Sequence, residues 1–549
     1  MNIQPSGADA VPDSRGINLY RADPDFARLL GLYLPDDLAR HLAPHLDRLG
    51  ALAGGVLDEL ATQADHHPPV LSHRTRRGED VQSIDYHPAY RSLERVAFGD
   101  YGLAALSHRA GVLDWPAPMP PAAKYALTYL FVQAEFGLCC PVSMTDSLSR
   151  TLRKFGSAEL VARYLPALTS QDMDVLMQGA MFMTEQGAGS DVGATAVVAR
   201  PGNDGTYRLW GDKWFCSNAD AELAMVLARP EGAAPGLAGV GLFLLPRTLP
   251  DGGANEYRIL RLKDKLGTRS MASGEIRFEG ATAFLVGDPG AGFKQMADMI
   301  NNSRLSNGVR AAGLMRRATT EAVHVARNRM AFGKRLIEMP LMQRQLAKML
   351  VRTEQARSMV FQTAEALRRA DAGEHGAYAL LRILTPLLKF RACRDARGVT
   401  GDAMEVRGGI GYIEEWPDAR LLRDAHLGSI WEGTSNIVAL DVLRAASREG
   451  SLEALSAHVR GLLDAARGDE GLRPALHRAV ELAMHATSDP ALARAAASGL
   501  YHVTSAAAMA WEATRLDDAR RHAMSRMVVR HRILARDPLG VEEKEALLF

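Results

Sequence analysis

A carboxylate set among aromatic, glycine and hydroxyl residues is the feature of this sequence best suited to chemistry. Glu432 follows Trp431 and precedes Gly433, Thr434 and Ser435. A partly buried carboxylate beside an aromatic ring can serve as a general base. The same residues could instead begin a helix, with Thr434 or Ser435 as its N-cap. The local sequence alone leaves both interpretations open.

Another segment in this half of the chain could approach phosphate groups. Arg329 stands shortly before Phe332 and a glycine, and a guanidinium group can donate two parallel hydrogen bonds to a diphosphate. An arginine at the end of a predicted helix is also common because it complements the helix dipole.

A segment of small and hydroxyl residues, 183–192, is a further candidate binding loop. It contains Thr184, Gly189 and Ser190. Small residues leave backbone N–H groups accessible to an oxygen-rich ligand. The glycine spacing is not the G-x-G-x-x-G of a Rossmann dinucleotide site, so that fold is excluded here. A tight turn between a helix and a strand is the simpler alternative.

Phe215 and Ser217 form a possible platform for a planar ligand. They lie two residues apart in a run predicted to be a strand, so their side chains are expected on one face. An aromatic ring and a hydroxyl group on one face suit a planar heterocycle with hydrogen-bonding edges. Packing of Phe215 in a core would explain half of this pattern without a ligand.

The spacing of apolar residues predicts helices on both sides of a β region. Apolar residues recur three and four positions apart through most of residues 17–180 and again from 293 onward. Between 181 and 290, short apolar runs alternate with turn formers, and 17 of the 49 glycines fall there, which indicates strands. Long helices are stable chiefly when packed together, so a bundle is expected. The sequence thus predicts an α+β multidomain protein with four domains: an N-terminal helical domain (1–180), a middle β domain (181–290), a helical bundle domain (291–446) and a C-terminal helical domain (447–549).

Taken together, these motifs resemble the acyl-CoA dehydrogenases. They occur in that family's order over roughly residues 120–446. The resemblance implies an FAD-dependent oxidoreductase with a helical domain, a middle β domain and a four-helix domain. It implies that Glu432 removes the α-proton of an acyl-CoA while hydride leaves the β-carbon for the flavin, and that Arg304 helps to position this base.

The resemblance also implies which residues surround the FAD. Glu405 stands where a flavin-contacting glutamine is usual, and Trp431, bulkier than the usual tyrosine, could narrow the acyl pocket. The implied cofactor-binding residues are Thr184, Gly189, Ser190, Phe215, Ser217, Arg329, Phe332, Glu405, Gly408, Gly409, Thr434 and Asn436.

Further segments are similar to the AidB-like branch of this family, which is linked to the adaptive response to alkylating agents. They include residues 18–20, 86–90, 140–145, 261–267 and 403–406. The resemblance implies a homotetrameric flavoprotein that binds double-stranded DNA, protects it from alkylation and has weak dehydrogenase activity. The alternative is a metabolic acyl-CoA dehydrogenase that passes electrons to an electron-transfer flavoprotein.

The charge distribution bears on the DNA hypothesis. The 65 basic and 64 acidic residues give a net charge of +1, which excludes a protein that is basic throughout. Residues 515–536, however, contain seven arginines and only two aspartates. In a helix Arg526 and Arg530 would share a face, as phosphate contacts require. The predicted DNA contacts are these two arginines, Arg521 of the same segment, and Arg444, which the resemblance implies. Alternatively, the arginine-rich segment is a solvated or salt-bridged helix face that contacts no DNA.

The remaining features predict a cytoplasmic protein without a metal site. The four cysteines show no C-x-x-C spacing and are too few for a disulfide framework. The first residues lack the pattern of a signal peptide, and no uncharged apolar run reaches the roughly 18 residues of a membrane span.

Overall fold

The structure, a computed structural model, describes residues 11–467 and 471–535. The chain divides into two compact units. The helical unit contains the described residues up to 56, residues 120–134 and those from 304 onward, and the β unit contains residues 57–119 and 135–303.

The helical unit is built from long amphipathic helices and one very short hairpin. Its elements are α1 (Pro24–Leu30), α2 (Asp36–Ala53), α5 (Pro121–Phe131), α8 (Gly292–Asn328, from residue 304), β10 (Met330–Ala331), β11 (Lys334–Arg335), α9 (Pro340–Asp371), α10 (Ala377–Arg407), α11 (Pro417–Gly428), α12 (Ser435–Arg448), α13 (Ser451–Asp464), α14 (Leu472–Ser488), α15 (Ala493–Leu516) and α16 (Ala519–Val528).

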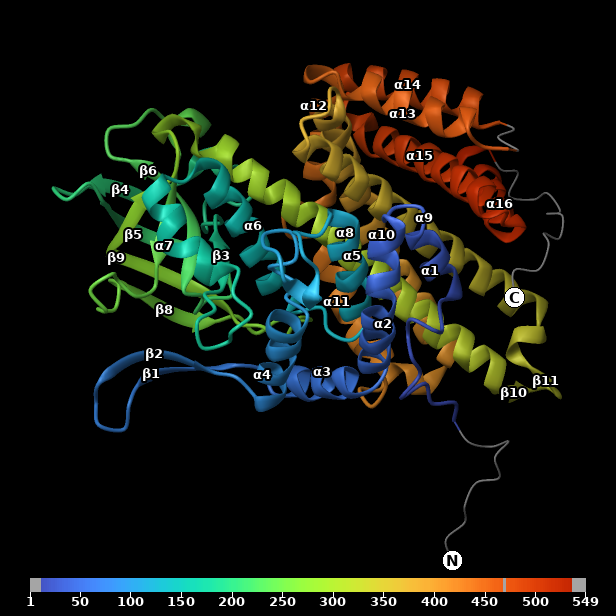
Figure 1. The fold of residues 1–549 in the computed structure, drawn as a ribbon, viewed down its shortest axis with the longest axis horizontal. Coiled ribbons are helices and arrows are strands. Elements are labelled where there is room, and N and C mark those ends of the chain that lie inside the picture. The colour runs from blue at the N-terminus through green and yellow to red at the C-terminus, as the bar shows by residue number, and fades with distance from the viewer. Residues whose placement is uncertain (1–10, 468–470, 536–549) are drawn as a thin grey trace, which may run out of the picture. The chain divides into compact units, whose positions relative to one another are not determined.

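The C-terminal helices pack directly on the bundle that precedes them. Helix α15 contacts α9, α10 and α12 as well as its neighbours α13 and α14, and Figure 1 shows α13–α16 stacked beside these helices. Ten residues in a row of α15, from Tyr501 to Ala510, are buried. Their many alanines let neighbouring helices approach closely on several sides. The described residues of 451–467 and 471–535 therefore complete the helical unit and share its core.

The β unit combines a strand-rich centre with shorter helices. Its elements are α3 (Val56–His66), β1 (Val70–Arg74), β2 (Asp80–Asp85), α4 (Pro88–Glu94), α6 (Cys139–Phe155), α7 (Ala158–Leu168), β3 (Gly179–Phe182), β4 (Val198–Pro201), β5 (Tyr207–Ser217), β6 (Leu223–Pro230), β7 (Gly241–Pro246), β8 (Tyr257–Leu262) and β9 (Ser273–Leu285).

The main sheet of the β unit closes on itself. Its strand order is β3-β6-β4-β5-β9-β7, with β8 on β9, and β7 also pairs with β6. Inside, apolar side chains including Phe182, Leu209, Val226, Phe243 and Phe278 form a buried cluster. Gly205, at a φ of 78°, forms the predicted turn between β4 and β5. The glycine-rich β region predicted from the sequence is thus confirmed.

One element contradicts the predicted helical N-terminal stretch. Residues 70–85 form an antiparallel hairpin in which Val70 pairs with Asp85 and Ser72 with Ser83. Its turn contains Gly78 at a φ of 87°, a conformation that glycine adopts without steric cost. Leu71 packs on the strand cluster of the β unit, so tertiary contact stabilises two strands too short to give a periodic signal.

None of the helices in the described part of the chain combines the length and hydropathy that a membrane-spanning segment needs.

Candidate active site

The structure places Glu432 at the start of α12, in a turn that holds its side chain inside the helical unit. Glu432 has a φ of 54°, Gly433 a φ of 99°, and Thr434 is the N-cap of α12. Only 6% of the Glu432 side chain is exposed. Its carboxylate accepts a hydrogen bond from the Asn307 side chain, which comes from α8. The fold therefore buries the Glu432 carboxylate and orients it through the hydrogen bond from Asn307.

Two basic side chains fix the backbone beside Glu432. The Arg304 guanidinium donates to the Glu432 carbonyl oxygen at 3.1 Å and pairs with Asp441 at 2.6 Å. Lys389 Nζ donates to the next carbonyl, that of Gly433. Burial lowers the pKa of Lys389 to about 8, against the opposing effects of Cys393 and Glu432. Arg304 thus contacts the backbone that carries the Glu432 carboxylate.

A third cation faces the carboxylate itself. Arg310 is fully buried on α8, and its Nη2 lies 4.0 Å from Glu432 Oε1. Its guanidinium also lies over the Trp431 ring, 4.8 Å from the ring centroid. The sequence motifs did not single out Asn307 or Arg310. Many other polar residues lie on the same helix, so the local sequence contains no signal that would single out these two.

The predicted diphosphate-binding residues lie at two places in the helical unit. Arg329, just after α8, donates from Nη1 to the Arg407 carbonyl at 2.8 Å, which brings it beside Gly408 at the end of α10. A Cβ atom added to Gly408 would lie 3.7 Å from Arg329 Nη1, and one added to Gly409 would meet nothing within 4 Å. The structure thus brings Arg329 close to these two glycines, which the family resemblance implied to share one site.

The other cofactor residues of the helical unit are exposed. Phe332 is 97% exposed and has a φ of 52°. Thr434 is the N-cap of α12 and Asn436 lies in its first turn, where backbone N–H groups favour an anion. Glu405 is exposed near the end of α10 and accepts a long, 3.4 Å hydrogen bond from Gln345.

In the β unit, a buried ion pair anchors the loop that contains Thr184, Gly189 and Ser190. Glu185 pairs with the fully buried Lys213 at 2.6 Å and accepts hydrogen bonds from the backbone N–H groups of Ala196 and Val197. Gly189 and Ser190 are exposed, and a Cβ atom on Gly189 would meet nothing within 4 Å. The motif is therefore a loop held at Glu185 with an accessible small-residue tip.

The predicted Phe215 and Ser217 platform lies at the end of β5 next to two lysines that the sequence motifs missed. Phe215 is 52% exposed, and the Ser217 and Ser273 hydroxyls lie 3.1 Å apart. A register irregularity between Lys213 and Cys216 interrupts the simple alternation that was expected. Lys263 Nζ lies 4.7 Å from the centroid of the Phe215 ring, and Lys265 donates to Ser273 Oγ at 3.2 Å. Both lysines come from the 261–267 segment, noted only for its family resemblance.

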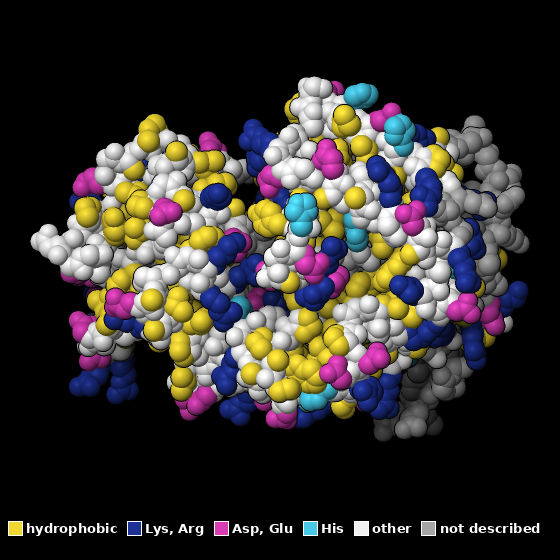
Figure 2. Space-filling view, turned by 45° about the horizontal axis from the view of Figure 1, so that its top comes forward, with side chains coloured by type: hydrophobic (Ala, Val, Ile, Leu, Met, Phe, Trp, Pro, Cys, Tyr) yellow, Lys and Arg dark blue, Asp and Glu magenta, His cyan; other side chains and the backbone are white. Residues whose placement is uncertain are grey.

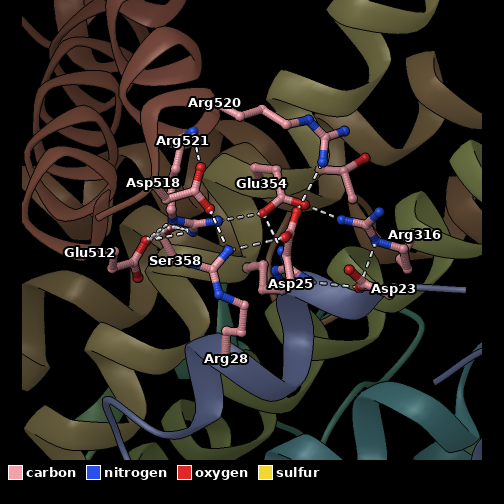
Figure 3. A network of polar contacts seen from close by, with 12 residues as sticks. Asp23, Asp25, Arg28, Arg316, Glu354, Ser358, Glu512, Asp518, Arg520 and Arg521 are labelled. Carbon is pink, nitrogen blue, oxygen red and sulfur yellow. Dashed lines mark hydrogen bonds and ion pairs between the residues drawn. The ribbon is translucent and has the colours of Figure 1, made fainter. Parts of the chain in front are cut away.

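The structure contradicts the prediction that Arg521 contacts DNA. Its side chain is 2% exposed and its guanidinium pairs with Glu354 at 2.8 Å and with Glu512 at 2.5 Å, in the network that Figure 3 shows. Nearby, Arg520 pairs with Asp25 at 3.0 Å. Acidic groups from α1, α9 and α15 thus neutralise part of the charge excess counted along the sequence. An arginine that is buried and paired in this way cannot reach a phosphate group.

Three of the predicted DNA contacts lie at the surface. Two of them are exposed: Arg526 in α16 and Arg530 in the π-helical turn Val529–Ile533 that follows. The third, Arg444, has a side chain that is 56% exposed and pairs with Asp441 at 3.2 Å. Arg536 lies outside the described residues. On the face drawn in Figure 2, Lys and Arg side chains are mixed with Asp and Glu side chains. The structure therefore leaves a smaller basic surface than the sequence indicated.

Comparison with known proteins identifies the family. Residues 180–281 match "Acyl-CoA dehydrogenase, middle domain" and residues 290–447 match "Acyl-CoA dehydrogenase, C-terminal domain". Acyl-CoA dehydrogenase family member 11 of Caenorhabditis elegans is 32% identical over 85% of this chain and 77% of its own length. The chain belongs to the acyl-CoA dehydrogenase family. It is an FAD-dependent oxidoreductase of the acyl-CoA dehydrogenase type, which confirms the predicted enzyme class, cofactor and fold class.

Within the family, the AidB-like resemblance is also confirmed. Residues 9–175 match "Adaptive response protein AidB N-terminal domain". The putative acyl-CoA dehydrogenase AidB of Escherichia coli is 35% identical over 72% of this chain and 72% of its own length. The crystal structure of Caenorhabditis elegans ACDH-11 in complex with C11-CoA covers 96% of this chain and 93% of its own, with 28% identity and a TM-score of 0.88.

The residues present fit the FAD of this family. The β unit offers an exposed aromatic ring, Phe215, with hydroxyl groups at Ser217 and Ser190 for a planar heterocycle with polar edges. The helical unit offers Arg329 beside two uncrowded glycines and the helix N-terminus at Thr434, which are the donor types that a diphosphate requires.

Proposed function

We propose that this protein catalyses the α,β-dehydrogenation of an acyl-CoA thioester with Glu432 as the general base. The buried Glu432 carboxylate, held by Asn307 on a backbone tied down at two successive carbonyls, is the observation that supports this proposal. A carboxylate fixed in one place can accept the α-proton without reorganising. FAD, when bound, supplies the two-electron acceptor. Arg304 and Lys389 keep the base in position.

The first test is reduction of the flavin by acyl-CoA in the absence of oxygen. We test a panel of short, medium and long acyl-CoAs, including the C11-CoA bound by ACDH-11. We expect at least one of them to decrease the flavin absorbance after anaerobic mixing with the enzyme. The measurement is stopped-flow absorbance of the holoenzyme, with the matching free fatty acids, which lack the acidifying thioester, as controls. Absence of bleaching with every acyl-CoA would contradict the proposal. An electron-transfer flavoprotein is the proposed electron acceptor for reoxidation.

A second proposed function is binding of duplex DNA, which protects the DNA from alkylating agents. It is supported by the match of residues 9–175 to an adaptive response protein and by the exposure of Arg444, Arg526 and Arg530. The predicted homotetramer belongs to the same proposal. The exposed apolar side chains of Phe332, Leu341 and Tyr412, between 81% and 97% exposed in the single chain, support assembly of several copies.

Salt dependence tests the DNA proposal. If the three arginines of one subunit contact phosphates, log K should fall by about 2.7 for each tenfold rise in salt, and by proportionally more if further subunits contact the same duplex, because each contact releases counterions. Replacing Arg444, Arg526 and Arg530 together by glutamine should remove most of this slope in a fluorescence anisotropy titration with duplex DNA. Arg21→Gln, which changes an exposed arginine paired with Asp47, is the matched control and should leave the slope unchanged. Equal slopes for the triple variant and the wild type would refute the assigned surface.

A further inference from the structure

We propose that Asn307 is a positioning residue for the base, acting as a hydrogen-bond donor whose orientation is fixed by the Trp431 indole. The inference rests on the proposed dehydrogenase function of Glu432. It assigns a role to a residue of α8 that lies 125 positions before the base in sequence.

The indole decides which way the Asn307 amide faces. The Trp431 indole nitrogen donates to Asn307 Oδ1 at 2.6 Å. An indole can only donate, so it requires the carbonyl oxygen of the amide on its side. The amide nitrogen is thereby turned toward Glu432, where it donates to the carboxylate. Because Asn307 is 1% exposed, water cannot replace either contact.

The groups around this contact are mostly basic. From α8, Arg310 lies 4.0 Å from the Glu432 carboxylate and Arg304 contacts the Glu432 carbonyl oxygen. From α10, Lys389 contacts the next carbonyl, and burial raises the pKa of the Cys393 thiol to about 11, so that this thiol is neutral. From α12, Asp441 faces this region, and it is paired with Arg304 and Arg382.

Asn307 differs from these cations in what it does. Arg310 attracts the carboxylate as a charge, whereas Asn307 supplies a directional hydrogen bond that fixes the rotation of the carboxylate plane. The Trp431 indole consequently takes part in positioning the base. It belongs to a chain of two hydrogen bonds, from the Trp431 indole to the Asn307 amide and from this amide to the Glu432 carboxylate.

This role predicts an order of effects that a purely structural role would reverse. Asn307→Asp keeps the size and shape of the side chain but replaces the donor by a second carboxylate against Glu432, and two carboxylates in contact compete for one proton. Asn307→Ala removes the donor without adding a charge. We expect the rate of flavin reduction by acyl-CoA at neutral pH to fall about 10-fold in Asn307→Ala and about 100-fold in Asn307→Asp. If Asn307 only filled space, Asn307→Ala would be the more damaging change.

The experiment measures flavin reduction and acyl-CoA dissociation constants by stopped-flow absorbance for the purified holoenzymes. Substrate dissociation constants should change less than about threefold, and the Asn307→Asp deficit should shrink as the pH rises from about 6 to about 9, because the shared proton is lost. Asn203→Ala, in the exposed turn between β4 and β5, is the matched substitution control. Trp431→Phe keeps a ring but removes the N–H donor, and should lower the rate several-fold.

Three results would overturn the inference. They are an Asn307→Asp rate equal to or above that of Asn307→Ala, an Asn307→Asp deficit that is independent of pH, and a wild-type rate in Trp431→Phe. The Trp431→Phe measurement decides the question if Asn307→Asp does not retain flavin. A wild-type enzyme that no acyl-CoA reduces would refute the proposed function and this inference together, whereas the wrong order of variants would refute the inference alone.

Discussion

Glu432→Gln should lower the rate of flavin reduction by acyl-CoA by about 10²–10⁴-fold, the range that general-base catalysis contributes. Glutamine has nearly the same shape as glutamate, and its amide oxygen can still accept the hydrogen bond from Asn307. The turn at 432–434, held through backbone carbonyls by Arg304 and Lys389, should remain intact. The amide cannot take up the α-proton, so the chemical step is lost while the site persists.

Two further measurements on Glu432→Gln distinguish loss of the general base from disruption of the flavin and acyl-CoA binding sites. Flavin content and the acyl-CoA dissociation constant of Glu432→Gln should stay within about threefold of the wild type, while only the reduction rate falls. Glu449→Gln, which changes a glutamate just after the opposite end of α12, is the matched control and should reduce the flavin at the wild-type rate. A Glu432→Gln enzyme that is reduced within about tenfold of the wild-type rate would show that another group accepts the proton.

Glu354→Gln should destabilise the protein by about 3–5 kcal/mol, the cost of removing one partner from a buried ion pair network. Glu354 is buried on α9 and pairs with Arg316, Arg357 and Arg521. Arg357 also pairs with Asp23 at 2.6 Å, and Arg521 with Glu512, so the network joins α1 and the C-terminal helices to α9, as Figure 3 illustrates. Without the Glu354 charge, three guanidinium groups remain close together with too few counter-charges.

Glu365→Gln is the matched control for this prediction. Glu365 lies on the same helix and pairs with Arg368, but 34% and 44% of their side chains are exposed, and such pairs contribute at most about 1 kcal/mol. Urea unfolding followed by circular dichroism measures both variants. A loss of less than about 1 kcal/mol in Glu354→Gln would refute the proposed structural role of the network.

The same network predicts how this contribution depends on pH. Burial alone would raise the pKa of Glu354, but the positive charges of Arg357, Arg316 and Arg521 outweigh it and hold the pKa well below its ordinary value. A carboxyl group whose pKa is lowered by folding stabilises the protein above its unfolded-state pKa. The stability difference between wild type and Glu354→Gln should therefore be constant at neutral pH and shrink as the pH falls below about 4.

The sequence was informative where the signal is local. The β region from 179 to 285 and the long helices from 292 onward follow from glycine-rich turns and apolar periodicity, which act over a few residues. The hairpin at 70–85 was missed because its strands have five and six residues and depend on packing against the β unit for their stability. The order of the motifs that contain Glu432 and Arg329 indicated the protein family. The contacts that these two side chains make are seen only in the structure.

The sequence by itself determined the family of this protein and its main elements, because these are encoded in residue types and their local spacing. Only the tertiary structure decided which charges meet. Arg521 appeared to belong to a basic surface, yet it is neutralised by Glu354, 167 residues away, and Asn307 reaches Glu432 across 125 residues. A charge count along the chain cannot detect such pairs, because electrostatic and hydrogen-bond energies depend on distance in space. In the folded protein the Arg521 guanidinium lies 2.8 Å from the Glu354 carboxylate, so the residue predicted to contact DNA forms a structural ion pair instead.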